Sequence, residues 1–193
     1  MDPFYETRRL GYRQLYFEGQ RRSLTWTNGF QRIPTRLYSA LLPCFHKSGR
    51  MVDLGCGNGL LLRFLVNHSF HVLEPFGVDF LPEAIHEAQT LVHPDRPGNF
   101  VVKNIVEWRP DGLFDFIMFD PYQVRQTDLH AFFEHCTSNL APDGRTIVYC
   151  YADALAALSL CKISEFPGME HTPLIELDCP SGIQVAFAGL SRT

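Results

Sequence analysis

The sequence predicts an α/β fold built on one mostly parallel sheet. Apolar runs of strand length alternate with amphipathic stretches of helical length from residue 50 to residue 162. Only "PSG" separates the last two apolar runs, 173–179 and 182–192, so no helix fits between them. The alternation favours right-handed βαβ units, and the short turn favours an antiparallel hairpin. We therefore expect a three-layer sandwich with a seven-stranded, mostly parallel sheet that ends in a C-terminal antiparallel hairpin.

The expected strands share a short apolar centre. They are "RMVDLG" (50–55), "FGVDF" (76–80), "NFVVKN" (99–104), "LFDFIMFD" (113–120), "GRTIVYCYA" (144–152), "PLIELDC" (173–179) and "GIQVAFAGLSR" (182–192). The expected helices begin at a proline, at a capping side chain or directly at a glycine. They are 32–45 opened by Pro34, 59–67, 82–92 opened by Pro82, 127–140 capped by Thr127 and 153–162 capped by Asp153. Residues 1–20 add a weaker helical periodicity.

Length and charge predict one domain with two unlike parts. The 193 residues suit a single domain, 1–193, and 46% hydrophobic residues provide a sizeable core. The net charge of −4 does not suggest a general nucleic-acid binder. Residues 1–48 carry eight Lys or Arg and three acids, whereas the rest carries nine bases and eighteen acids. We expect an N-terminal helical arm or lid, 1–45, on a core of 46–193. The arm either pairs its arginines with the acidic core or binds a partner.

The cysteine and histidine patterns indicate no metal site. The six cysteines show no C-x-x-C spacing, and the eight histidines show no ligand pattern, so no metal is expected. Several cysteines lie in apolar runs, which is typical of small buried residues in a reducing compartment. "MDPFYETRR" lacks a signal-peptide core, and no apolar run reaches the ~18 residues of a membrane helix. These features predict a soluble, cytoplasmic protein with no membrane partner.

A turn with three glycines follows the first strand of the core. In "VDLGCGNG" (52–59), Asp53 precedes Gly55, Gly57 and Gly59, and a helical pattern begins directly afterwards. Glycine permits positive φ and close approach of a ligand, and N–H groups at a helix start favour electron-rich groups. Taken alone, the pattern also fits a plain chain reversal.

Asp79 favours the ligand-binding interpretation through its position. It ends the second expected strand, 20 residues after Gly59, where an acid suits contact with both hydroxyls of a ribose. As a single residue it also suits the N-cap of the helix that follows. The glycines read G-x-G-x-G rather than G-x-G-x-x-G, and Asp53 beside them would repel a pyrophosphate. A nicotinamide dinucleotide is therefore disfavoured.

An ordered set of motifs resembles the class I S-adenosylmethionine-dependent methyltransferases. The segments are "VDLGCGNG" for the first motif, "GVDF" for the second-strand acidic motif, "FVVKNIVEW" for the third, "FDFIMFDPY" for the fourth strand and "LAPDGRTIVYC" for the fifth. The resemblance runs from about residue 35 to the end of the chain. It implies a Rossmann-like fold, with S-adenosyl-L-methionine as cofactor and S-adenosyl-L-homocysteine as product.

The resemblance also implies roles for single residues. The glycine turn surrounds the methionine part of the cofactor, and Asp53 supports the turn and the ligand's amino group. Asp79 holds the ribose, while Phe80 and Ile105 contact the adenine. Asn104 replaces the family's usual Asp, and its amide oxygen can still accept a bond from the adenine amino group. The full expected set is Asp53, Gly55, Cys56, Gly57, Asn58, Gly59, Asp79, Phe80, Asn104, Ile105 and Asp120.

The expected acceptor end is "FDPYQ" (119–123), directly after the fourth strand. Amino-directed members of the family often carry an acid or Asn, two prolines and an aromatic residue there. This chain has one proline fewer, which puts nucleobase amine methylation in doubt. Asp120 and Tyr122 are the candidate catalytic residues: Asp120 orients an amine or acts as base, and Tyr122 contacts the substrate. The alternatives are a turn-capping role for Asp120 and a lid role for Tyr122.

Together these features predict a methyltransferase that acts on an O or N of a small-molecule or peptide acceptor. One alternative is an RNA-directed methyltransferase that uses the basic arm. Another is a catalytically silent, cofactor-binding subunit. The sequence leaves open both the acceptor and the oligomeric state.

Overall fold

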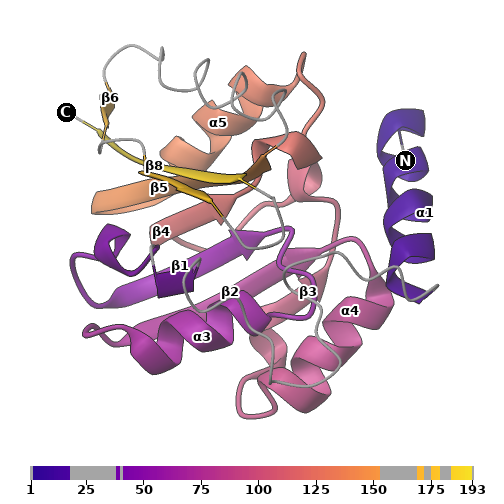
Figure 1. Cartoon of the computed structure of the whole chain (residues 1–193), viewed down its shortest axis with the longest axis horizontal. Coiled ribbons are helices and arrows are strands. Elements are labelled where there is room, and N and C mark those ends of the chain that lie inside the picture. Colours follow the sequence, from indigo (N-terminus) through magenta and orange to yellow (C-terminus); the bar gives the residue numbers. More distant parts are fainter. Residues whose placement is uncertain are drawn as a thin grey trace.

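The computed structural model describes residues 2–17, 38–39, 41–152, 169–171, 175–178 and 184–192. Its strands form one sheet with the order β3-β2-β1-β4-β5-β8-β6, and β7 pairs with β8 (Figure 1). The strands are β1 Gly49–Leu54, β2 Leu73–Asp79, β3 Phe100–Val102, β4 Phe114–Phe119, β5 Leu140–Ala152, β6 Met169–His171, β7 Ile175–Asp178 and β8 Gln184–Arg192. β1 to β5 are parallel, whereas β8 runs antiparallel to β5, β6 and β7.

Helices precede the sheet and connect its parallel strands. They are α1 Pro3–Phe17, α3 Leu60–His68, α4 Pro82–Glu87 and α5 Leu129–Ser138. A π-helical turn, η3 (Ala88–Val92), continues α4. Short 3₁₀ turns complete the connections: η2 Leu42–Cys44, η4 Pro97–Asn99, η5 Ile105–Glu107 and η6 Pro121–Gln123. The predicted α/β fold with a parallel sheet is confirmed.

Several details differ from the sequence-based expectation. The described sheet has five parallel strands and eight in total, not seven. Its antiparallel end is not one added two-stranded hairpin, because β8 pairs with β5 along Arg145–Ala152 and carries both β6 and β7. α5 has Asp128 as its N-cap rather than Thr127, and it ends before β5 begins at Leu140. The helix expected at 153–162, and half of the residues of that expected at 32–45, lie outside the described residues.

Two apolar clusters cover opposite faces of the sheet. Successive residues of a strand point to opposite faces, so Met51 and Met118 join the first cluster while Val52 and Ile117 join the second. Helical side chains of the first cluster come from α3, α4 and η3: Leu61, Leu62, Phe64, Leu65, Ile85 and Ala88. Those of the second cluster come from α5: Leu129, Phe132, Phe133 and Cys136. The helices therefore form two outer layers, with the sheet between them (Figure 1).

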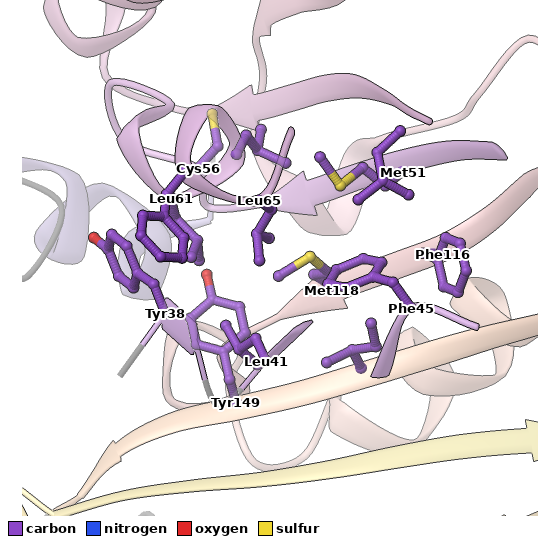
Figure 2. Packing of buried hydrophobic residues seen from close by; sticks show 14 of the residues in the cluster. Tyr38, Leu41, Phe45, Met51, Cys56, Leu61, Leu65, Phe116, Met118 and Tyr149 are labelled. Atoms are coloured by element: carbon purple, nitrogen blue, oxygen red, sulfur yellow. The ribbon is translucent and has the colours of Figure 1, made fainter. Parts of the chain in front are cut away.

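Figure 2 shows how the first cluster closes beneath the glycine turn. Tyr38, Leu61 and Tyr149 lie together there. Cys56 belongs to the same cluster, with its sulfur turned away from these three side chains and close to Gly77 of β2. All four side chains are at most 2% exposed. Burial of such side chains stabilises a fold by roughly 1.5–3 kcal/mol for each large apolar residue. The turn thus rests on a closely packed base.

Candidate functional site

The candidate site lies at the carboxyl end of the parallel strands. Strand order reverses between β1 and β4, which makes their ends the topological switch point of the sheet. Asp53 lies near the end of β1, Asp79 ends β2, and Asp120 follows β4 directly. The topology therefore brings together three acids that are far apart in the sequence.

The glycine turn has a left-handed backbone. Its glycines have φ of 95° at Gly55, 55° at Gly57 and 78° at Gly59, a region that side chains disfavour. The N–H groups of Gly55 and Cys56 donate to the carbonyl of Val78 at 2.7 and 3.1 Å. These bonds tie the turn to β2. Gly59 is also the N-cap of α3, so the turn ends where the helix begins.

Asp79 holds the turn by accepting backbone hydrogen bonds. Its Oδ2 accepts from the N–H of Gly57 at 2.9 Å, and its Oδ1 accepts from the N–H of Leu81 at 2.8 Å. Burial raises the pKa of Asp79, and the surrounding N–H groups oppose that rise. The N-cap of α4 is Leu81, so Asp79 is not that cap. Each carboxylate oxygen has two lone-pair sites, which leaves capacity to accept from ligand hydroxyls.

Asp53 is the most deeply buried of the three acids. Its Oδ1 accepts from the hydroxyl of Tyr149 at 2.8 Å, while its Oδ2 is buried without a hydrogen-bond partner. Burial raises the pKa of Asp53 to about 7; the Tyr149 hydroxyl opposes the rise, and the negative charges of Asp79 and Asp120 add to it. A buried carboxylate oxygen without a partner is energetically costly. A cationic group placed beside Oδ2 would remove that cost.

Asp120 and Tyr122 form the acceptor end of the site. Asp120 is 5% exposed, and its Oδ1 accepts from the N–H of Tyr122 at 2.9 Å as the N-cap of η6. Asp120 therefore does cap a turn, as the capping alternative expected. The capping contact uses one of its two carboxylate oxygens. Tyr122 is 45% exposed, and its ring lies 4.3 Å beneath the guanidinium carbon of Arg8 in α1. Neither contact tests a catalytic role, which stays a prediction.

The residues expected at the adenine differ in exposure. Phe80 is half-buried, and its ring centroid lies 5.9 Å from that of Tyr12. Asn104 is 4% exposed and caps η5, because its Oδ1 accepts from the N–H of Val106 at 3.3 Å. Ile105 is 2% exposed and packs in the second core cluster. Phe80 is the most accessible of the three, and their contacts with adenine stay predictions.

The two non-glycine residues of the turn face inward. Cys56 is fully buried in the core, so only its backbone belongs to the ligand side of the turn. Asn58 is 5% exposed, and its Nδ2 donates to Glu87 Oε2 at 3.3 Å. Its Oδ1 is buried without a hydrogen-bond partner. Asn58 thus joins the turn to the end of α4.

α1 packs across this carboxyl edge (Figure 1, indigo). The hydroxyl of Tyr5 donates to Asp128 Oδ2 at 2.8 Å and accepts from the N–H of Arg125 at 3.3 Å, next to the start of α5. Arg13 reaches Glu83 of α4 at 3.0 Å. The helix therefore lies between the loops that follow β2 and β4.

Two further residues reach the glycine turn without a clear sequence signal. The side-chain amide of Gln123, in η6, lies so close to Gly55 that a Cβ on that glycine would overlap it. Gln123 is the last residue of "FDPYQ", and its position directly after β4 is the one sequence feature that could have indicated a place near the turn. Nε2 of His93 lies 3.0 Å from the carbonyl oxygen of Gly59, and its ring stacks on Phe100. Burial lowers the pKa of His93, which favours a neutral ring that donates to this carbonyl.

Within the described residues, no group of three or more His, Cys, Asp or Glu side chains has a metal-binding arrangement. None of the helices in the described part of the chain is long and apolar enough to cross a membrane. Three cysteines in that part, Cys44, Cys56 and Cys136, are free and buried.

Solved methyltransferases share this fold. The 1,6-didemethyltoxoflavin-N1-methyltransferase of Burkholderia thailandensis has a TM-score of 0.74 and 17% identity, over 98% of this chain and 89% of that one. Magnesium protoporphyrin IX methyltransferase from Synechocystis PCC 6803, solved with bound SAM, has a TM-score of 0.70 and 16% identity, over 97% of both chains. At these identities, the likeness shows a Rossmann-like fold.

Sequence comparisons show the family. The ubiquinone biosynthesis O-methyltransferase of Rhodopseudomonas palustris (strain HaA2) is 29% identical over 102 residues. The aligned part covers 51% of this chain and 38% of that relative, so the match spans less than half of the relative's length. A family profile described as a methyltransferase domain matches residues 25–167, which is most of the chain. The chain therefore belongs to the methyltransferase domain family.

Proposed function

We propose that the protein transfers a methyl group from S-adenosyl-L-methionine to an oxygen or nitrogen of a small molecule. The observation that carries the proposal is the meeting of Asp53, Asp79 and Asp120 around a glycine turn at the switch point. Buried carboxylates that repel one another are unfavourable without a cation. A ligand with a sulfonium and an ammonium group supplies positive charge, whereas a pyrophosphate adds negative charge.

The residues present fit this cofactor. Asp53 Oδ2, buried without a partner, suits the ammonium group of the methionine part. The turn at Gly55 and Gly57 gives that part a backbone surface without side chains, and the Gln123 amide reaches the same surface. Asp79 is proposed to accept from the ribose hydroxyls while it holds the turn. Support for the acceptor class comes from the curated relative, whose name describes an O-methyltransferase.

The chain's own contribution to the chemistry is mainly alignment. S-adenosyl-L-methionine carries its methyl group on a positively charged sulfur. When the methyl group is transferred, this sulfur is the leaving group and becomes a neutral thioether. Orientation of the two reactants can supply roughly 7–11 kcal/mol of barrier reduction. We propose that Asp120 orients the acceptor and takes its proton when the acceptor carries one, and that Tyr122 contacts the acceptor. Burial of Asp120 suits a proton acceptor, because water is largely kept from its carboxylate.

We propose that residues 1–45 form a lid on a core of 46–193. The described part of this segment supports the proposal, because α1 contacts the loops after β2 and β4 through Tyr12 and Tyr5. Two α1 arginines are engaged in ion pairs, Arg9 with Glu6 and Arg13 with Glu83. This use of basic residues favours a small acceptor over RNA. The three free, buried cysteines favour a reducing, cytoplasmic setting.

Calorimetric titration with S-adenosyl-L-homocysteine tests the cofactor assignment. We expect binding in roughly the micromolar range, and a loss of about ten-fold or more in Asp79→Ala, because a charged acceptor for two hydroxyls is removed. Asp111→Ala is the matched control, since Asp111 is an exposed acid away from the strand ends, and its affinity should equal that of the wild type. Thermal unfolding of each variant checks that it is folded. Absence of binding at about 1 mM ligand would contradict the proposal.

A further inference from the structure

We infer that Arg8 binds a negatively charged group of the methyl acceptor, and that this acceptor is a small planar molecule carrying a carboxylate or a phosphate. The inference rests on the proposed function, because it assigns the substrate class of the same site. It depends on a charge in α1 that has no ionic partner among the residues the structure describes.

Arg9 and Arg13 of α1, and Arg125 of the core, are each matched with acids. Arg9 pairs with Glu6 at 2.5 Å, and Arg13 pairs with Glu83 at 3.0 Å. Arg125, beneath the helix, contacts both Asp2 and Asp128. Arg8 has no ion pair with any acid in the described part of the chain, although its side chain is half-buried against the protein. A half-buried guanidinium without a counter-ion is suited to an anionic ligand.

The contacts that Arg8 does make leave its hydrogen-bond donors available. Its guanidinium carbon lies 4.3 Å from the ring centroid of Tyr122 and 5.1 Å from that of Phe4. These cation–π contacts supply no oxygen acceptor to the five N–H donors of the guanidinium. A planar fork of donors matches the two oxygens of a carboxylate or phosphate. The contact with Tyr122 therefore holds the guanidinium at the acceptor end of the site without supplying it an anion.

Arg8 lies over Tyr122, two residues after the group proposed to receive the acceptor's proton. Tyr12, one helical turn further along α1, has its pKa raised to about 12, by burial first and then by the charge of Asp120. The charge of Arg8 acts on the same hydroxyl in the opposite direction, and Tyr122 and Asp79 act on it as well. Two contacts link the same groups: Arg8 lies over the ring of Tyr122, and the N–H of Tyr122 donates to Asp120 Oδ1. We infer that an acceptor whose reactive atom meets Asp120 directs its charged end toward Arg8.

The surrounding charges and rings indicate the kind of acceptor. Asp53, Asp79 and Asp120 make the floor of the site negative, so an anionic acceptor is tolerated only if a cation faces its charged end. Arg8 is placed to be that cation at the outer rim. Two aromatic rings lie close to this part of the site, because Tyr12 contacts Phe80 and Tyr122 contacts Arg8, and such flat surfaces favour a planar acceptor.

A paired-acceptor screen tests the inference. Full-length protein is incubated with S-adenosyl-L-methionine labelled in the methyl group and with aromatic hydroxy and amino acids, each beside its neutral amide. One such pair is 4-hydroxybenzoate and 4-hydroxybenzamide. We expect the accepted compounds to be acids, with kcat/KM at least about ten-fold above that of the matching amide. The reason is that the amide cannot form the charged, two-fold hydrogen bond between a carboxylate and the Arg8 guanidinium. Arg8→Gln should remove this preference through KM while leaving the affinity for S-adenosyl-L-homocysteine unchanged.

Arg9→Gln is the matched control, because Arg9 is the next residue on α1 and already pairs with Glu6. It should retain the preference for acids. The inference is overturned if amides are methylated as well as acids, if Arg9→Gln acts like Arg8→Gln, or if RNA is the accepted substrate. It is also overturned if S-adenosyl-L-homocysteine binds but nothing in the panel is methylated. Failure of S-adenosyl-L-homocysteine to bind, by contrast, refutes the proposed function itself.

Discussion

At the scale of single residues, Gly55 meets a conformational and a spatial requirement together. Its φ of 95° is strained for any other residue, and a Cβ would also overlap the amide of Gln123. We expect Gly55→Ala to lower the free energy of unfolding by about 1–3 kcal/mol and to weaken S-adenosyl-L-homocysteine binding. Urea unfolding and calorimetry measure the two effects.

Gly98 offers the matched comparison for this substitution, because an added Cβ there meets no atom within 4 Å. Gly98→Ala should change the free energy of unfolding by less than about 0.5 kcal/mol. The double variant Gly55→Ala with Gln123→Ala should recover the stability lost through overlap with the Gln123 side chain. It should not recover the stability lost through the positive φ at residue 55. Equal effects at Gly55 and Gly98 would contradict the assignment of the turn.

Sequence reasoning singled out three acids of the candidate site but not their partners. The resemblance placed Asp53, Asp79 and Asp120 in one expected cofactor-binding set, and the structure brings them together at the carboxyl edge of the sheet. The hydroxyl that binds Asp53 comes from Tyr149, 96 residues away, and no local pattern marks it. His93 contacts Gly59, 34 residues earlier, and no helical or strand periodicity of the sequence marks this contact. Such contacts depend on tertiary packing, which spacing alone does not encode.

At the scale of elements, the end of α4 shows what helical periodicity leaves out. The pattern at 82–92 predicted one helix, whereas the structure has α4 followed by the π-helical turn η3. The N–H of His93 bonds to the carbonyl of Ala88 at 2.7 Å, five residues back. A widened turn of this kind shifts the residues that follow it. Here it precedes the buried ring that contacts Gly59, so the deviation from a regular helix lies at the candidate site.

Tyr5 is a buried residue that attaches α1 to the core. We expect Tyr5→Phe to remove the bonds to Asp128 and Arg125 and to destabilise docking of α1 by roughly 1 kcal/mol. Amide hydrogen exchange within α1 should then be about five-fold faster. Leu10→Ala, at an exposed position of the same helix, should leave exchange unchanged. Unaltered exchange in Tyr5→Phe would show that α1 is held by other contacts.

At the scale of the whole molecule, the alternation of strands and helices predicted the parallel half of the sheet better than its antiparallel end. β1 to β4 lie within or close to the expected ranges, because each has an apolar centre and a following helix or turn. β5 is longer than expected and starts at Leu140, with a register shift against β4 between Phe114 and Phe116. β6 has three residues, too few for a two-residue alternation to be visible. Short edge strands are fixed by pairing with neighbours rather than by their own pattern.

The three acids also couple the stability of the whole fold to pH. Asp53 has a pKa of about 7 in the folded protein, against an ordinary value of 3.8. Between these values the folded state holds a proton that the unfolded state releases, so this carboxyl's contribution to stability decreases as pH rises. The contribution is fully present below pH 3.8 and is lost as pH passes through 7. The slope is at most about 1.4 kcal/mol per pH unit.

Asp53→Asn isolates this effect, because an amide oxygen can still accept from the Tyr149 hydroxyl while no charge develops. We expect the variant to gain stability relative to the wild type as pH rises from about 5 to 8, measured by urea unfolding at each pH. Parallel curves would show that Asp53 keeps one protonation state across this range. Saturating S-adenosyl-L-homocysteine should flatten the wild-type curve, because its ammonium group stabilises the ionised carboxylate. The same ligand should have no such effect on the slope in Asp53→Asn, which links the pH dependence of the fold to the proposed cofactor contact.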